Sequence, residues 1–169
     1  MFPESIQLVI VTPERQLLSF DVSEVTLPGA EGELGVLPGH APLITELGIG
    51  ELTYRGAYTD VSVPPTGETV EQEFRPPDWR PHVAIIRGFA EILGDRVTVL
   101  AETAERPEEI DIQRAKAALD RAEKRIAAGA GAQEIDWDRA TAALQRALVR
   151  LKVAEYAPRS KRSVAVPGQ

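Results

Sequence analysis

The chain has 169 residues, 43% of them hydrophobic and 27% charged, which is typical of one folded domain or a domain with a small appendage. Its 19 basic and 26 acidic residues give a net charge of -7, which argues against a general nucleic-acid binder. There is no cysteine, and the two histidines are His40 and His82. This composition excludes disulfides and thiolate metal sites, and we predict neither a catalytic residue nor a metal site.

The sequence also lacks a membrane-spanning pattern. No stretch reaches the roughly 18 consecutive apolar residues that a spanning helix needs. The first apolar run, residues 6–11, follows no basic leader and is interrupted by Thr12 and Pro13. We therefore expect a first strand rather than a signal peptide, and no direct membrane insertion.

The first 106 residues have the pattern of a β-rich domain. Short β-prone runs are separated by glycine or proline, and Gly94-Asp95 is a predicted hairpin turn. Many short strands at this spacing favour a β-sandwich or barrel. The runs cover residues 6–11, 17–20, 22–27, 34–37, 43–47, 51–54, 83–86, 89–93 and 96–100.

Residues 56–81 interrupt this pattern. They contain five of the 13 prolines, which remove hydrogen-bond donors from a sheet. We predict an inserted proline-rich loop or an extended hairpin tip. A tolerated insertion is the favoured interpretation, and a contact made by Trp79 is the alternative.

The second half, residues 107–156, is helical and contains a repeat. Residues 110–126 and 135–151 both fit I-D-x-x-R-A-x-A-A-L-x-R-A-x-x-R-[I/L]. Each copy begins with an aspartate that can cap a helix, Asp111 and Asp136. The small residues at 127–133 join the copies into a predicted antiparallel helical hairpin.

Both predicted helices place a mostly alanine stripe beside an arginine stripe. Because alanine buries little apolar area, we expect a hairpin that is marginal unless it docks on another surface, and that can adopt more than one arrangement. The arginines are Arg114, Arg121 and Arg125 in the first copy, and Arg139, Arg146 and Arg150 in the second.

Charge is divided unevenly between the halves. Residues 1–106 carry 7 basic and 17 acidic side chains, whereas residues 107–169 carry 12 basic and 9 acidic ones. This asymmetry indicates that each half faces a different partner. Residues 157–169 lack helical periodicity and are predicted to be a disordered basic tail.

Four motifs resemble, in order, the epsilon subunit family of bacterial F-type ATP synthases. They are the LVIVTPER opening, EGELGVLPGHAPLIT at residues 31–45, IIRGFAEILGDRVTVLAETAER at residues 85–106, and IDIQRAKAALDRA at residues 110–122. The resemblance covers nearly the whole chain and implies an α+β fold: an N-terminal ten-stranded β-sandwich followed by a C-terminal antiparallel two-helix hairpin. The 56–81 segment is longer than the family's usual hairpin link.

The resemblance implies a non-catalytic rotor subunit at the cytoplasmic side of the bacterial inner membrane. Its sandwich is expected to bind the gamma subunit through His40 and Ala41 and the c-ring through Glu31 and Glu33. Its hairpin is expected to permit ATP hydrolysis when folded on the sandwich, and to inhibit hydrolysis when extended toward the alpha/beta catalytic head. Without a resemblance, Glu31 and Glu33 fit turn and surface charges better than acid–base chemistry.

The family also implies regulatory ATP bound to the folded hairpin, with no permanent cofactor. Arginines suit phosphate, and Asp111 can accept a hydrogen bond from adenine or ribose. The alternative is that Asp111 only caps a helix and the arginines are solvated. The matching positions are Glu105, Ile110, Asp111, Arg114, Ala115 and Arg121, with Arg146 and Arg150 joining from the second helix.

Two other functions are the alternatives to a rotor subunit. A free-standing nucleotide-sensing β-sandwich module would bind ATP as a lone monomer, whereas a rotor subunit needs gamma and the c-ring. A carbohydrate-binding sandwich would need exposed aromatic side chains, and the aromatic content of 5% argues against it.

Overall fold

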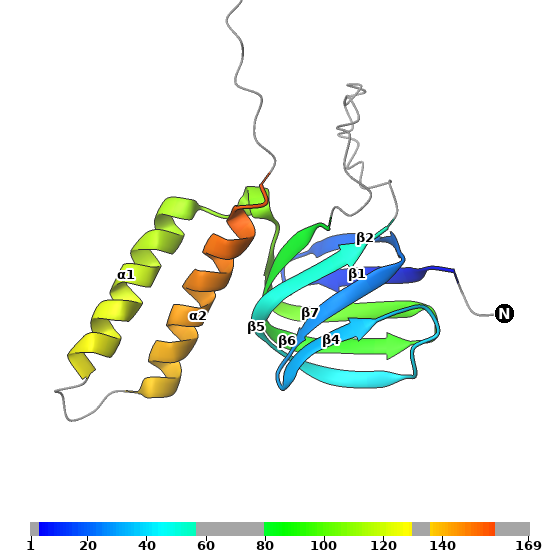
Figure 1. Cartoon of the computed structure of the whole chain (residues 1–169), viewed down its shortest axis with the longest axis horizontal. Coiled ribbons are helices and arrows are strands. Elements are labelled where there is room, and N and C mark those ends of the chain that lie inside the picture. The colour runs from blue at the N-terminus through cyan, green and yellow to red at the C-terminus, as the bar shows by residue number, and fades with distance from the viewer. Residues whose placement is uncertain (1–3, 57–79, 130–135, 158–169) are drawn as a thin grey trace, which may run out of the picture.

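The computed structural model describes residues 4–56, 80–129 and 136–157. Most of the predicted 56–81 loop, including Trp79, and nearly all of the predicted 157–169 tail lie outside the described residues. Within the described part, strands precede helices along the chain (Figure 1).

Seven strands form one continuous sheet over the described residues, in the order β2-β1-β7-β6-β5-β3-β4. β1 pairs with β7 in parallel, and the other neighbours are antiparallel. Gly94 and Asp95 make the predicted turn between the last two strands. The strands are β1 (Ile6–Val11), β2 (Gln16–Val22), β3 (Glu24–Gly29), β4 (Gly32–Val36), β5 (Leu43–Arg55), β6 (His82–Leu93) and β7 (Arg96–Glu105).

The sheet curves around a single apolar core, as a β-sandwich does. Every one of the seven strands contributes buried side chains to the same cluster, including Leu8, Leu27, Leu52 and Val99, which are completely buried. In β1 the buried and half-buried residues alternate strictly, as expected for a strand with one face on the core. The predicted sandwich is thus confirmed as an architecture.

The strand count differs from the expected ten. The predicted runs 43–47 and 51–54 are parts of one strand, β5, and the runs 83–86 and 89–93 are parts of β6. In β6 the core-facing positions change from Val83 and Ile85 to Ala90 and Ile92, which are of opposite parity. A single long strand that bends can therefore contribute to both layers of a sandwich, where the sequence predicts two separate strands.

The bend in β6 lies at Arg87 and Gly88, whose φ angles are 56° and 137°. A Cβ atom on Gly88 would lie 2.1 Å from the Leu100 carbonyl oxygen of β7. Because only glycine accepts this φ angle and this close approach, Gly88 fixes where β6 bends.

The helical half begins with a short 3-10 helix, η1 (Pro107–Glu109), followed by α1 (Ile112–Gly129) and α2 (Trp137–Ala154). Asp111 Oδ1 accepts a 2.9 Å hydrogen bond from Arg114 N, and Asp136 Oδ1 accepts one of the same length from Arg139 N. Both predicted N-caps are confirmed. In Figure 1, α1 and α2 lie side by side, with α2 next to β5 and α1 on its far side.

A small apolar contact joins α2 to the outer face of the sheet. Ala84 and Ile86 of β6 alternate with the core residues of that strand and point toward the helix. They form a second buried cluster with Ile110, Val149, Val153 and Ala154, and Ile49 packs against it. The helical hairpin is thus docked on the sheet through α2.

Candidate functional site

A cavity of about 200 Å³ lies between α1 and α2, and we call it the arginine cavity. Arg121 and Arg125 come from α1, and Arg146 and Arg150 from α2. The remaining wall is made of alanines at positions 118, 122, 140, 143 and 147, which let the helices approach closely. Arginine is the side chain best suited to bind an anion with several oxygens, so four arginines around one cavity favour such a ligand.

Arg150 is held in place from the sheet. Its Nε donates a 2.5 Å hydrogen bond to Glu105 Oε2 at the end of β7, and both side chains are largely covered. This bond leaves the two terminal nitrogens of Arg150 for the cavity. Within the described residues, Arg121, Arg125 and Arg146 have no carboxylate within ion-pair distance. The cavity therefore carries uncompensated positive charge.

The structure divides the residues predicted to bind nucleotide into two groups. Arg121, Arg146 and Arg150 line the arginine cavity, and Glu105 reaches it through Arg150. The others gather at the start of α1: Ile110 is buried against α2, Asp111 caps α1, Arg114 is exposed, and Ala115 is buried.

Sequence reasoning missed Arg125 as a candidate, although the structure places it in the cavity wall. A signal was available, because Arg125 follows Arg121 by four residues and so lies on the same helix face. Arg114, seven residues before Arg121, lies on the same side about 10 Å further along the axis.

The residues expected to meet the c-ring lie at one end of the sheet. Glu31 is in the turn between β3 and β4, Glu33 is on β4, and both side chains are exposed. They are two residues apart at the tip of the β3–β4 hairpin, so both carboxylates are available to a partner.

The residues expected to meet gamma lie in the turn before β5. His40 N donates to the Leu37 carbonyl oxygen at 3.1 Å, which closes this turn, and His40 Nδ1 lies 2.7 Å from the Ala41 carbonyl oxygen. His40 is half-buried, whereas Ala41 is exposed. The chain then enters β5 directly.

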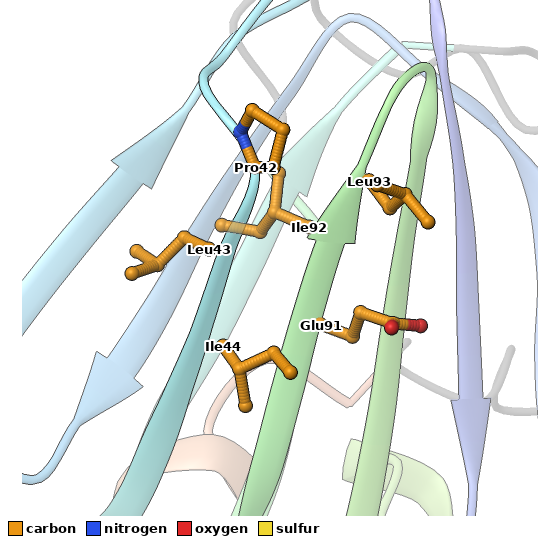
Figure 2. A pocket seen from close by; sticks show the side chains of 6 residues that line it. All are labelled: Pro42, Leu43, Ile44, Glu91, Ile92 and Leu93. Atoms are coloured by element: carbon orange, nitrogen blue, oxygen red, sulfur yellow. The ribbon is translucent and has the colours of Figure 1, made fainter.

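An exposed apolar face, which sequence reasoning missed, begins next to this turn. Figure 2 shows Leu43 and Ile44 at the start of β5, with Pro42 just before them, beside Glu91, Ile92 and Leu93 of β6. Together they surround a cavity of about 240 Å³. Ile44 is 70% exposed, and Phe89 of β6 pairs with Leu100 of β7 on the same outward side. The sequence did contain an indication of this face. Phe89 and Leu93 occupy strand positions that alternate with the core residues, where polar side chains are expected.

The connection from the sheet to the hairpin is tied to the β1–β2 end of the sandwich. Arg106 Nη2 donates to the Leu17 carbonyl oxygen at 2.7 Å, and Glu109 pairs with Arg15. Burial by itself raises the pKa of Glu109, but bonds from Arg106 N and Arg15 outweigh it and lower that pKa below the ordinary value. The segment up to Glu109 thus belongs to the sandwich, and the helices begin after it.

These features define a class of protein. The class is a β-sandwich with exposed apolar and acidic surfaces and a helical hairpin docked on it. Among the described residues, no helix is long and apolar enough to cross a membrane. Family models agree: residues 5–63 match "ATP synthase, Delta/Epsilon chain, beta-sandwich domain", and residues 108–155 match "ATP synthase, Delta/Epsilon chain, long alpha-helix domain".

The chain belongs to the ATP synthase epsilon chain family, whose members are non-catalytic subunits of that complex. It is 46% identical to the ATP synthase epsilon chain of Solibacter usitatus over 122 residues, covering 72% of this chain and 76% of the relative. It is 43% identical to that of Geobacter metallireducens over 156 residues, covering 92% and 98%.

Solved structures share the fold. A chain in the Euglena gracilis mitochondrial ATP synthase (OSCP/F1/c-ring) matches with a TM-score of 0.67 and 22% identity, covering 92% of this chain and 84% of that one. A chain in the Tetrahymena thermophila mitochondrial ATP synthase (central stalk and c-ring) matches with a TM-score of 0.50 and 15% identity, covering 89% and 93%.

Proposed function

We propose that this chain is a rotor subunit of a proton-translocating F-type ATP synthase, bound peripherally at the cytoplasmic side of the bacterial inner membrane. In this role the sandwich couples the gamma subunit and the c-ring to ATP synthesis, and the hairpin regulates ATP hydrolysis. Family membership supports the role, and it favours this role over a free-standing nucleotide-sensing module.

The gamma subunit binds the exposed apolar face together with the His40–Ala41 turn. The face offers Ile44, Phe89 and Leu93 to solvent, with Glu91 among them. Arg96 of β7 is exposed and pairs with Leu93 at the edge of this face. Exposed apolar patches bordered by charged side chains are typical of protein interfaces. Glu31 and Glu33, at the hairpin tip, contact the c-ring.

A direct test replaces Phe89 with Asp and measures co-purification with gamma. We expect at least a tenfold loss of binding, because a charge would enter the desolvated contact. The matched control is Leu148→Asp, the same kind of change at an exposed apolar position of α2, outside the exposed apolar face. Equal binding of Phe89→Asp and wild type would contradict the placement of gamma.

Regulation requires that the hairpin can leave the sandwich. The small apolar contact between α2 and β6 supports such a release. Only six buried side chains make up that contact, and two of them are alanines, which bury little apolar area. A helix pair held this way can exchange between a docked and an extended position. Extended, its basic side chains would meet the alpha/beta catalytic head and block hydrolysis.

Regulatory ATP binds the docked hairpin, with its phosphates in the arginine cavity. The cavity, about 200 Å³, is smaller than usual small-molecule pockets of roughly 300–1,000 Å³. It therefore suits the phosphate chain, while the nucleoside lies toward Asp111 and Ala115 at the start of α1. The single observation that carries this proposal is the convergence of Arg121, Arg146 and Arg150 with Arg125 on one cavity.

The test has two measurements. In the assembled complex, removal of all residues after Arg106 should raise ATP hydrolysis, because the extended hairpin can no longer enter the head. In the full chain, Arg121→Ala with Arg146→Ala should weaken ATP binding at least tenfold, since each guanidinium–phosphate contact contributes about 1.5–3 kcal/mol.

Lys116→Ala is the matched control for the arginine variants, because it removes an exposed cation of α1 that does not line the cavity. Equal ATP affinity in wild type and the double arginine variant would contradict the nucleotide site. Unchanged hydrolysis after truncation would contradict regulation by the hairpin while leaving the rotor role in place.

A further inference from the structure

Four side chains outside the arginine cavity connect the C-terminal end of α2 to the sheet. Glu51 of β5 and His82 of β6 come from the sandwich, and Lys152 and Tyr156 come from the C-terminal end of the hairpin. We call these four residues the docking cluster.

Glu51 is the shared acceptor of the cluster. Its Oε1 pairs with His82 Nδ1, and its Oε2 lies 2.5 Å from Lys152 Nζ. The carboxylate thus uses one oxygen within the sheet and the other toward the helix. The hydrogen bond from Lys152 to Glu51 raises the pKa of the lysine, which is consistent with a stabilised charged pair.

Tyr156 covers the imidazole of His82. The two ring centroids are 3.4 Å apart, and the ring planes differ by 8°, so the rings are stacked. The side chains of Glu51 and His82 are each only 13% exposed. Since His82 and Glu51 lie on neighbouring strands, Tyr156 closes over a preformed pair on the sheet.

The cluster complements the apolar contact of α2. That contact ends with Val153 and Ala154, and Tyr156 follows immediately, where its N donates to the Val153 carbonyl oxygen at 3.0 Å. Lys152 lies in the last turn of α2, and Tyr156 lies in the turn that follows the helix. The last turn of α2 is therefore fixed to the sheet by an ion pair and a stacked ring beyond its small apolar seam.

We propose that the docking cluster is a latch that sets the fraction of hairpin docked on the sandwich. When α2 leaves the sheet, Glu51 and His82 remain paired on their strands, whereas Lys152 loses its carboxylate and Tyr156 loses its stacking partner. Within the docking cluster, the difference between the two states thus lies in Lys152 and Tyr156, and it adds to the loss of the Glu105–Arg150 pair and of the apolar contact of α2. The latch concerns docking itself and does not depend on whether the hairpin regulates hydrolysis.

Amide hydrogen exchange of the full-length chain tests the latch. Tyr156→Ala should speed exchange of the α2 amides about two- to tenfold, the range expected for loss of one aromatic pair. Tyr156→Phe keeps the ring and should exchange like wild type. Unchanged α2 exchange in Tyr156→Ala would overturn the proposal, as would an equal acceleration of the β1 and β7 amides, because that would indicate general unfolding.

The ion pair is tested with two lysine variants of the same chemistry. Lys152→Met should speed α2 exchange, whereas Lys124→Met should not, because Lys124 pairs 2.7 Å away with Asp120 within α1 and does not reach the sheet. In Glu51→Gln, a further Lys152→Met change should have a smaller effect than in wild type. Equal effects of Lys152→Met in both backgrounds would overturn the role of Glu51.

Discussion

At the scale of single residues, Gly88 determines the geometry of the sandwich. Its φ angle of 137° and its contact with the Leu100 carbonyl oxygen allow β6 to bend and to change its core-facing parity. A side chain at this position would strain the backbone and push β7 away. The resulting change would reach both the core and the face that holds α2.

Gly88→Ala should therefore destabilise the fold by about 2–4 kcal/mol. Urea unfolding of the full-length chain measures this free energy. Gly35→Ala is the control, because a Cβ there meets nothing within 4 Å, and its effect should stay within about 0.5 kcal/mol. Similar losses for both variants would contradict the steric account.

Glu109 gives the residue-scale prediction for pH. Its pKa is lowered in the folded state by its bonds to Arg106 N and Arg15, against the opposing effect of burial. Its contribution is thus present above the ordinary value of 4.5 and is lost as the pH falls through the lower folded pKa. Wild type and Glu109→Gln should differ in unfolding free energy at pH 7, and the difference should shrink below about pH 4.5. A constant difference would contradict this.

At the scale of elements, the repeated I-D-x-x-R-A motif acts as a helix start. Asp111 and Asp136 each accept a hydrogen bond from the amide three residues later. Asp111→Ala or Asp136→Ala should cost about 1 kcal/mol of stability, whereas asparagine at either position should cost little. Thermal unfolding of the full-length chain checks this, and asparagine variants as unstable as the alanine variants would contradict the capping role.

The helices, their caps and the alanine stripe could be predicted from the sequence because they depend on local spacing. Ala115 and Ala122 are buried as the stripe requires. The strand count could not be predicted in the same way. The glycines at 48 and 50 resemble loop residues in the sequence, whereas in the structure both lie inside the continuous strand β5, which pairs with β6 on either side of Gly48.

The candidate site was predictable only in part for a related reason. Periodicity places Arg121 and Arg125 on one face of α1, but the opposing face of α2 follows only from how the two helices pack. The bond between Glu105 and Arg150 joins residues 45 positions apart. The stack of Tyr156 on His82 also depends on the docked position of α2, so no local sequence pattern predicts it.

At the scale of the whole molecule, the chain is a sandwich that offers one face to partners and another to its own hairpin. The acidic first half and the basic second half meet at a few specific pairs, including Glu105 with Arg150 and Glu51 with Lys152. These pairs, the stack of Tyr156 on His82 and a small apolar seam connect the hairpin to the sandwich in the described part of the chain. Such a connection is strong enough to dock the hairpin and weak enough to release it.

The absence of cysteine from the chain makes a direct test of this account possible. Glu51→Cys and Lys152→Cys, bridged by a short bismaleimide, would tether α2 to the sheet in place of the ion pair. ATP hydrolysis by the assembled complex would be measured with the bridged chain, the unbridged double variant and reagent-treated wild type. The account predicts the highest hydrolysis rate for the bridged chain, because its hairpin cannot extend into the catalytic head. Equal rates for the bridged and unbridged chains would contradict it.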